Sequence, residues 1–426
     1  MYIGRRLAYL RRKRGFSQEG VAAGVVSRGH YSNIEAGRYR ALNDILVSLA
    51  DKLDVPANYL LQWESSSPVL EHYLIKLQYC LDNYEYKEAE SFIQTITKEF
   101  TYINSLHQEI HFLLLESLFY IKIKDYHRAK GVIEKVQYLT DEGKMVPACL
   151  KYLFYYVTGA WFYVAGFYEK SLENFKTALE KASSKNSTAR LYYNMALALY
   201  ETYDRGKAAE YGKKALEIFI NEHKWLHIIY IYLLLGVIHW DKREYSESEA
   251  YLHKALDLVK VYGNDELEGK VYHNLGLVYD SKHDKEKSIK YLILSVDKKL
   301  ADNCESIIIT YGVLAEVLIS AGQITRAGEV VRAAREYAKS EEHFSMLMAI
   351  EAKIHYTREN WTKYEEIMER LITYYRESER WSDVKLLSEE YSEYLGNRYK
   401  YKDAFYYSRA ALEAYRKLAE KGGGIR

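Results

Sequence analysis

A recurring frame of small and aromatic residues, which fills most of the chain, constrains the fold more than any other feature. Its clearest copy and the corresponding positions elsewhere are Gly159, Tyr168, Ser171, Phe175 and Ala178; Gly236, Tyr245, Ser248, Leu252 and Ala255; Gly276, Ser288 and Leu292; and Tyr86, Tyr126, Ala208, Gly322, Trp361 and Tyr401. Nine copies follow one another at a period of about 40 residues. Small side chains at fixed offsets let paired helices approach closely, and only three prolines occur in 426 residues. The sequence therefore predicts an all-α fold with a long helical repeat array.

The first 64 residues carry a different pattern, that of a helix-turn-helix. Ser17 and Ser27 each precede a short helical stretch and are expected to cap it, and Gly15 and Gly37 are expected to end the helices before them. Further helices are predicted at residues 3–14, 42–53 and 56–61. We expect a helix-turn-helix domain over 1–64, a linker over 65–69, repeats over 70–420 and a disordered tail over 421–426.

The charge of the chain is unevenly distributed between these two parts. The formal net charge is only +1, but residues 1–64 hold ten Lys or Arg against six Asp or Glu. Six of the basic residues precede the first acid, Glu19. This pattern favours a partner that carries phosphates over a merely solvated helix face.

The amino-terminal residues resemble the Xre and phage-repressor helix-turn-helix family. The resemblance rests on Leu10-Arg11, Ser17-Gln18-Glu19, Ser27 and Ile34-Glu35-Ala36-Gly37, and covers about sixty residues. It implies a structural ion pair between Arg11 and Glu35. The segment from Ser17 to Ser27 is one residue shorter than the commonest family pattern, as in peptide-responsive regulators of Gram-positive bacteria. Gly20 and Gly24, taken to lie inside the second helix, are expected to weaken it by about 1 kcal/mol each.

Residues at the exposed positions of the third helix are the candidates for reading double-stranded promoter DNA. Arginine suits guanine and asparagine suits adenine, so the predicted base contacts are Arg28, Asn33, Ser32 and His30. Helix amino termini and the loop after the third helix suit the DNA backbone, which gives the predicted phosphate contacts Gln18, Ser27, Arg38 and Arg40.

The repeats resemble tetratricopeptide repeats, which wind into a right-handed superhelix with a concave binding face. Asn194 and Asn274 occupy the same position in two copies, and an Asn amide can both donate to and accept from a peptide backbone. The neighbouring groove positions are Arg190, Tyr193, Tyr200, Tyr230, Trp240, Lys270 and His273. Arg190 and Lys270 are suited to a carboxylate. The alternative is that both Asn residues are ordinary surface residues, but two in register favour a bound peptide.

Joined in this order, the two parts resemble the quorum-sensing regulators of Bacillus and its relatives, and most of all the activators of extracellular neutral protease genes. This resemblance implies a short signalling peptide that is secreted and re-imported, and homodimers on promoter DNA. Relatives without the DNA-binding domain bind a sporulation response regulator, so the repeats are also considered as a module that sequesters such a partner.

Other classes of protein find little support in the sequence. Cys80, Cys149 and Cys304 lack the close spacing of a zinc or redox site. The amino terminus has no secretory pattern, and the apolar runs 152–168 and 225–240 are too short to cross a bilayer, so a cytoplasmic protein with no membrane partner is expected. His107 and His111 are four residues apart, but no third metal ligand is evident. We expect no cofactor, no metal and no catalytic residue.

Overall fold

The computed structural model describes residues 2–301 and 306–422, and every regular element in this part of the chain is a helix. The chain divides into two compact units, Met1–Lys224 and Trp225–Arg426. The division falls within the repeats, because the amino-terminal helices pack against the first repeats and share one unit with them. The last helix extends to Gly422. Of the tail expected over 421–426, residues 423–426 lie outside the described part of the chain.

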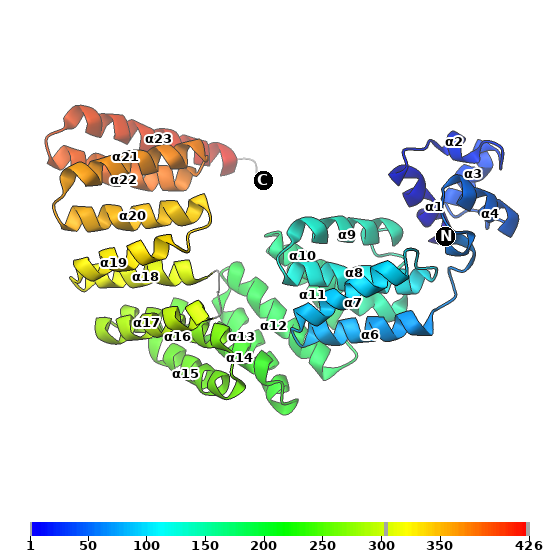
Figure 1. Ribbon diagram of the computed structural model, residues 1–426, viewed down its shortest axis with the longest axis horizontal. Helices are drawn as coiled ribbons and strands as arrows, with labels where there is room; N and C mark the ends of the chain where they lie inside the picture. Colours follow the sequence, from blue (N-terminus) through cyan, green and yellow to red (C-terminus); the bar gives the residue numbers. More distant parts are fainter. Residues whose placement is uncertain (1, 302–305, 423–426) are drawn as a thin grey trace. The chain divides into compact units, whose positions relative to one another are not determined.

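Five helices form the amino-terminal part of the first unit, at the blue end of the ribbon in Figure 1. They are α1 (Tyr2–Lys13), α2 (Gln18–Ala22), α3 (Arg28–Glu35), α4 (Asn43–Lys52) and α5 (Ala57–Leu61). Leu7, Tyr31, Leu49 and Leu60 are fully buried where these helices meet. Helices α1, α4 and α5 lie within one residue of their predicted bounds. Ser17 and Ser27 cap α2 and α3 as predicted, and Gly15 and Gly37 follow α1 and α3 in the left-handed region.

One prediction about the second helix is wrong. Gly24 does not lie inside α2, which ends at Ala22, and its φ of +76° is in the left-handed region that favours glycine. Gly24 therefore ends the helix without strain, and only Gly20 lowers the helical propensity of α2.

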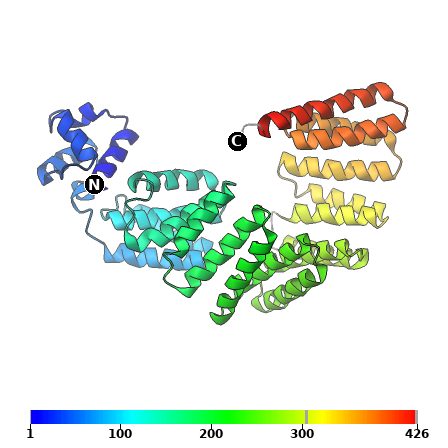
Figure 2. The ribbon, with the colours of Figure 1, turned by 180° about the vertical axis from the view of Figure 1, so that it is seen from behind.

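The remaining helices of the first unit form four antiparallel pairs, which we number as repeats 1 to 4. They are α6 (Pro68–Asp82) with α7 (Tyr86–Glu99), α8 (Leu106–Lys122) with α9 (Tyr126–Leu139), α10 (Lys151–Val164) with α11 (Tyr168–Leu179), and α12 (Lys185–Glu201) with α13 (Arg205–Asn221); a 3₁₀ turn, Ala148–Leu150, precedes α10. Each first helix contacts the first helix of the next pair, as α6 does α8 and α8 does α10. Figure 2 shows the same stacking from behind.

The second unit contains five further pairs among the described residues, numbered as repeats 5 to 9. They are α14 (Trp225–Asp241) with α15 (Tyr245–Tyr262), α16 (Asp265–Ser281) with α17 (Lys285–Ala301), α18 (Ile307–Ser320) with α19 (Ile324–Arg335), α20 (Glu341–Thr357) with α21 (Trp361–Glu377), and α22 (Trp381–Asn397) with α23 (Tyr401–Gly422). The apolar runs tested as membrane spans are α10 and α14, and no helix in the described part of the chain is long and apolar enough to cross a membrane.

The small residues of the repeat frame connect the two helices of a pair. The Ser171 hydroxyl donates to the Gly159 carbonyl at 2.8 Å, and Ser248 and Ser288 make the same bond to Gly236 and Gly276 at 2.7 and 2.8 Å. A Cβ atom at any of these glycines would lie within 2.7 Å of a large side chain of the second helix. The frame therefore specifies closely packed pairs, as the sequence predicts. We call this serine-to-glycine hydrogen bond the Ser–Gly brace.

Candidate functional site

The helix-turn-helix is defined by its two serine caps and by the packing behind it. The Ser17 hydroxyl accepts a hydrogen bond from the Gly20 amide at 3.0 Å, and that of Ser27 accepts one from the His30 amide at 3.2 Å. Tyr31 and Ile34 are buried on one side of α3. The opposite side of α3 is therefore available to a partner.

The predicted base-contact residues lie on this outer side but differ in exposure. Arg28 and His30 are exposed, whereas Ser32 and Asn33 are half-buried. The Asn33 carboxamide oxygen accepts a hydrogen bond from Arg38 at 3.3 Å. A base contact by Asn33 therefore competes with this internal bond.

The predicted phosphate-contact residues are arranged around the same helix. Arg38 and Arg40 are exposed in the loop after α3, and Ser27 is exposed at the amino terminus of α3. The Gln18 amide nitrogen instead donates to Glu35 at 3.0 Å. Arg11 pairs with the same Glu35 carboxylate at 2.7 Å, as the family resemblance implies. The Arg11–Glu35 pair joins α1 to α3, and the hydrogen bond from Gln18 connects α2 to the same carboxylate.

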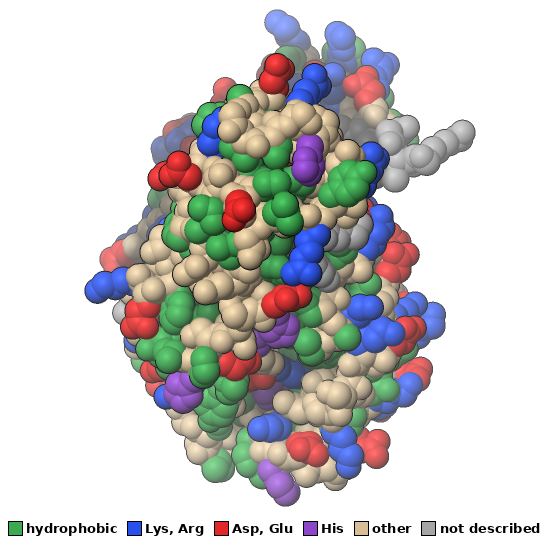
Figure 3. Space-filling view, turned by 90° about the vertical axis from the view of Figure 1, so that its right-hand side faces the viewer, with side chains coloured by type: hydrophobic (Ala, Val, Ile, Leu, Met, Phe, Trp, Pro, Cys, Tyr) green, Lys and Arg blue, Asp and Glu red, His purple; other side chains and the backbone are tan. Residues whose placement is uncertain are grey.

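Several basic residues at the amino terminus already have a partner within the protein. Arg5 forms an ion pair with Asp141 of the second repeat, and Arg14 pairs with Asp54 at 3.1 Å. Arg12 lies over the ring of Tyr138, 5.1 Å from its centroid. These partners lie far away in sequence, so a composition count could not detect them. Figure 3 views the side that carries the amino-terminal domain, where acidic side chains are interspersed with basic ones.

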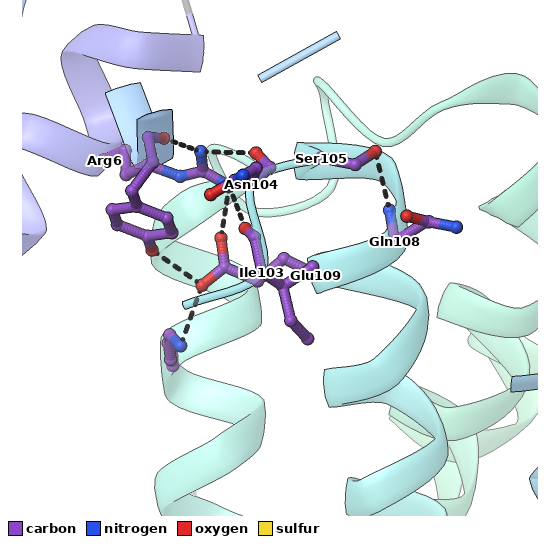
Figure 4. A network of polar contacts seen from close by, with 8 residues as sticks. Arg6, Ile103, Asn104, Ser105, Gln108 and Glu109 are labelled. Atoms are coloured by element: carbon purple, nitrogen blue, oxygen red, sulfur yellow. Dashed lines mark hydrogen bonds and ion pairs between the residues drawn. The ribbon is translucent and has the colours of Figure 1, made fainter. Parts of the chain in front are cut away.

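Arg6 attaches the helix-turn-helix domain to the second repeat. Its guanidinium is 1% exposed and pairs with Glu109 at 2.7 Å. It also donates to the backbone carbonyls of Asn104 at 2.9 Å, Ile103 at 3.3 Å and Tyr59 at 2.5 Å. Figure 4 shows these bonds converging from the segment before α8 and from α8 itself. We call this group, together with Lys135, the docking network.

Glu109 is the centre of the docking network. One of its oxygens accepts from the Tyr59 hydroxyl at 2.9 Å and from the Lys135 ammonium at 3.0 Å, while the other accepts from Arg6. Burial alone raises the pKa of Glu109, but the charges of Lys135 and Arg6 outweigh it and hold that pKa below its usual value. The carboxylate is therefore charged and satisfied in the folded protein. No pattern in the sequence indicated this role for Glu109.

The first group of predicted peptide-binding residues lies on α12 in the first unit. Arg190, Tyr193 and Asn194 are all half-buried. The Asn194 amide donates to the Tyr156 hydroxyl at 3.4 Å, and Arg190 forms an ion pair with Asp82 of α6. Asp82 and Tyr156 are not predictable from the sequence, because their proximity to α12 depends on the curvature of the repeats.

The second group lies on α14 and α16 in the second unit. Asn274, Lys270, His273 and Trp240 are half-buried. Lys270 pairs with Glu266 one turn away on the same helix, and Trp240 donates to the Ser281 hydroxyl at 2.8 Å. Burial and the charge of Lys299 lower the pKa of His273 to about 4, so His273 is neutral at neutral pH. Each cation selected for a ligand carboxylate thus already has a carboxylate of the protein beside it.

Known families match parts of both regions. Residues 7–60 match a helix-turn-helix family and residues 227–301 match a tetratricopeptide repeat family. Over 398 residues, the chain is 24% identical to the transcriptional activator NprA of Geobacillus stearothermophilus, covering 90% of this chain and 95% of the relative. Over 265 residues it is 25% identical to the regulatory protein RapD of Bacillus subtilis, covering 60% of this chain and 73% of the relative.

Solved structures agree with the fold. The apo form of the quorum sensor NprR from B. thuringiensis superposes with a TM-score of 0.67 at 19% identity, covering 81% of this chain and 98% of that one. NprR in complex with its cognate peptide NprX gives a TM-score of 0.55 at 18% identity, covering 83% and 99%. The protein is thus of the class that joins a helix-turn-helix to tetratricopeptide repeats. Within that class it is similar to the NprA and NprR regulators, which confirms the resemblance predicted from the sequence.

Proposed function

We propose that this protein is a DNA-binding transcription regulator whose repeats bind a short signalling peptide that controls its activity. It reads promoter DNA through α3 and acts in the cytoplasm as a homodimer. The likeness to an activator over nine-tenths of the chain supports activation, with extracellular neutral protease genes as the proposed targets. In this proposal residues 1–64 read DNA, 65–69 link the domains, and 70–420 sense the peptide.

One observation carries the DNA-binding part of the proposal. The outer side of α3 presents Arg28 and His30 to solvent, while Tyr31 and Ile34 on its inner side are fixed in the core. The basic residues Arg5 and Arg6 are occupied by acids of the repeats. The exposed edge of α3 and the loop that follows it are therefore the surface that best fits a major groove.

Genome-wide mapping of bound DNA, followed by binding assays on a recovered promoter fragment, tests this part. Arg28→Ala should weaken binding by about 1–3 kcal/mol and relax specificity at one base pair. Arg40→Gln should weaken binding equally on all sequences and reduce the salt slope by about one. Arg14→Gln, which removes a guanidinium already paired with Asp54, is the matched control and should leave affinity unchanged. Specific binding that survives Arg28→Ala with its base preference intact would exclude α3 as the reader.

The peptide-sensing part rests on Asn194 and Asn274 and on their neighbours Arg190, Tyr193, Lys270, His273 and Trp240. The fold shared with the peptide complex of NprR supports a peptide ligand in the repeats. A library of short synthetic peptides with free carboxyl termini supplies the probe. Asn194→Ala with Asn274→Ala should abolish the effect of a retained peptide on DNA binding and leave affinity without peptide unchanged. An unaltered peptide effect would remove both residues from the proposed site.

A second candidate function is a repeat module that sequesters a response regulator. The similarity to RapD, which covers 60% of this chain, favours keeping it. The two functions differ in one measurable respect. If Arg28→Ala with Asn33→Ala leaves promoter output unchanged while the protein retains a response regulator in pull-down experiments, the second function replaces the first.

A further inference from the structure

An ion pair joins two repeats that are not neighbours. Asp82 is the last residue of α6 in repeat 1, and Arg190 lies on α12 in repeat 4, 108 residues later. The two side chains are only 27% and 14% exposed. Repeats 1 and 4 are separated by two complete helix pairs, so they can meet only on the inner side of the curve that the first helices form. The pair therefore lies within the concave surface of the first unit.

Aromatic and amide groups surround this ion pair. The Arg190 guanidinium lies 6.0 Å from the ring centroid of Tyr156, which stacks on Tyr152 at 5.9 Å. The Tyr156 hydroxyl also accepts the hydrogen bond from Asn194. A half-buried guanidinium flanked by rings and an amide is what a peptide carboxylate requires, since arginine pairs with carboxylates in a planar, bidentate manner.

Asp82 is held in this position at a cost. Burial raises the pKa of the Asp82 carboxyl, and the charge of Arg190 only partly opposes this effect. A partly buried ion pair contributes little to the stability of the folded protein, because the cost of desolvating both charges offsets most of their attraction. A second carboxylate that offers Arg190 equal geometry and adds backbone contacts to Asn194 can therefore replace Asp82.

We propose that Asp82 is an internal substitute for a carboxylate of the ligand: the bound peptide gives its own carboxylate to Arg190 and releases Asp82. This inference rests on the proposed peptide-sensing function and goes beyond it in two respects. It assigns Asp82 the place at Arg190 that a ligand carboxylate takes. It also links peptide binding to a physical change, because release of Asp82 removes the bond between repeats 1 and 4.

The test uses the full-length protein and three matched libraries of short synthetic peptides. One has free carboxyl termini, one has amidated termini, and one has free termini but no Asp or Glu. Asp82→Asn removes the competitor and should increase retention of free-acid peptides about tenfold, a change of about 1.4 kcal/mol. Arg190→Gln should abolish that retention. Glu210→Gln, which breaks the exposed Lys214–Glu210 pair in the same unit, is the control and should change nothing.

The libraries separate the two sources of a carboxylate. If the terminus is recognised, amidation abolishes the gain; if a side chain is recognised, omission of Asp and Glu abolishes it. Retention that is insensitive to both changes overturns the proposal, as does an Asp82→Asn variant that retains no more peptide than the wild type. In either case the proposed function stands. If the wild type and every variant retain no peptide, peptide sensing itself is excluded.

A second variant guards against a simple folding defect. Asp82→Arg with Arg190→Asp restores the pair in reversed order but removes the guanidinium from its place beside Tyr156 and Asn194. It should fold and bind promoter DNA like the wild type and lose peptide retention. Hydrogen exchange provides an independent readout, because a retained peptide should increase exchange at the carboxyl-terminal end of α6 around Asp82. Unchanged exchange there, with peptide bound, contradicts the release of Asp82.

Discussion

At the scale of single residues, the folded state depends on buried charges whose partners come from distant parts of the chain. Glu109 is 6% exposed and pairs with both Arg6 and Lys135. Removing one partner of a buried ion pair destabilises the folded state by much more than the intact pair stabilises it, because the remaining charge is left uncompensated and poorly solvated. The docking network is therefore the place where one isosteric change should have the largest effect.

We expect Glu109→Gln to weaken the attachment of α1 to the repeats by about 3 kcal/mol. Hydrogen exchange of the α1 amides measures this directly, since α1 is attached to α8 through Arg6. Glu134→Gln removes one partner of an exposed pair with Lys130 and is the control, with an expected effect below about 0.5 kcal/mol. Equal protection of α1 in both variants would mean that the network does not hold the domain in place.

The buried imidazole of His111 gives the unfolding free energy a dependence on pH. Burial lowers the pKa of His111 from 6.5 to about 4, although the charge of Glu71 opposes this effect. In this interval the unfolded chain binds a proton that the folded chain does not. Above pH 6.5 His111 is neutral in both states and does not lower the free energy of unfolding. As the pH falls from 6.5 towards 4, proton binding to the unfolded chain lowers that free energy.

Chemical unfolding at about pH 7 and about pH 4.5 measures this contribution. The wild type should lose more stability over this interval than His111→Gln. The exposed His127→Gln should behave like the wild type. A His111→Gln variant with the pH dependence of the wild type would show that His111 does not contribute.

At the scale of elements, the spacing between paired helices depends on glycine. A Cβ atom at Gly159 would lie 2.7 Å from the ring of Phe175, whereas one at Gly131, also inside a helix, has no heavy atom within 4 Å. Gly159→Ala should therefore cost about 1–3 kcal/mol. Gly131→Ala should stabilise the protein by about 1 kcal/mol through helix propensity alone. Thermal unfolding of the two variants compares them, and shifts of the same sign would contradict the packing argument.

The turns within several helix pairs contain a non-glycine residue with a left-handed backbone conformation, which no pattern in the sequence indicated. The turns of repeats 1, 2, 4 and 5 place Tyr84, Lys124, Tyr203 and Arg243 at φ between 61° and 63°, where glycine is usual. Lys124→Gly should relieve this strain and stabilise the protein by about 0.5–1 kcal/mol, since the gain exceeds the entropy that glycine adds to the unfolded chain. Lys124→Ala keeps a Cβ atom and should give no gain in urea unfolding. A stabilising alanine would point to the lysine side chain instead.

Elements were predictable from sequence where their signals are local. The caps Ser17 and Ser27 and the terminating Gly15 and Gly37 act within a few residues, so the amino-terminal helices could be delimited in advance. The repeat frame was visible because it recurs. Pairings such as that of Arg6, separated from its partner by 103 residues, depend on how the repeats stack and left no pattern in the sequence.

At the scale of the whole molecule, the two compact units should unfold separately. Most contacts in repeat arrays are between neighbouring repeats, and the ion pair between Asp82 and Arg190 lies within the first unit, so a local destabilisation spreads little to the other unit. Urea unfolding of the full chain should therefore depart from a two-state transition. Gly159→Ala should lower protection against hydrogen exchange in residues 2–224 and leave residues 225–422 unchanged. Equal loss in both units would show that the array unfolds as one cooperative body.

The Ser–Gly brace has a consequence for how such a chain can change its length over evolution. Each of the three braces closes within a single helix pair, between Ser171 and Gly159 for example, and none crosses to the next pair. A recombination that duplicates or deletes a whole pair leaves every hydroxyl and carbonyl matched, whereas a crossover between the two helices of a pair separates them. Insertions and losses should accordingly accumulate at the boundaries between pairs. The brace therefore identifies the helix pair as the unit that is duplicated or deleted when the array changes length.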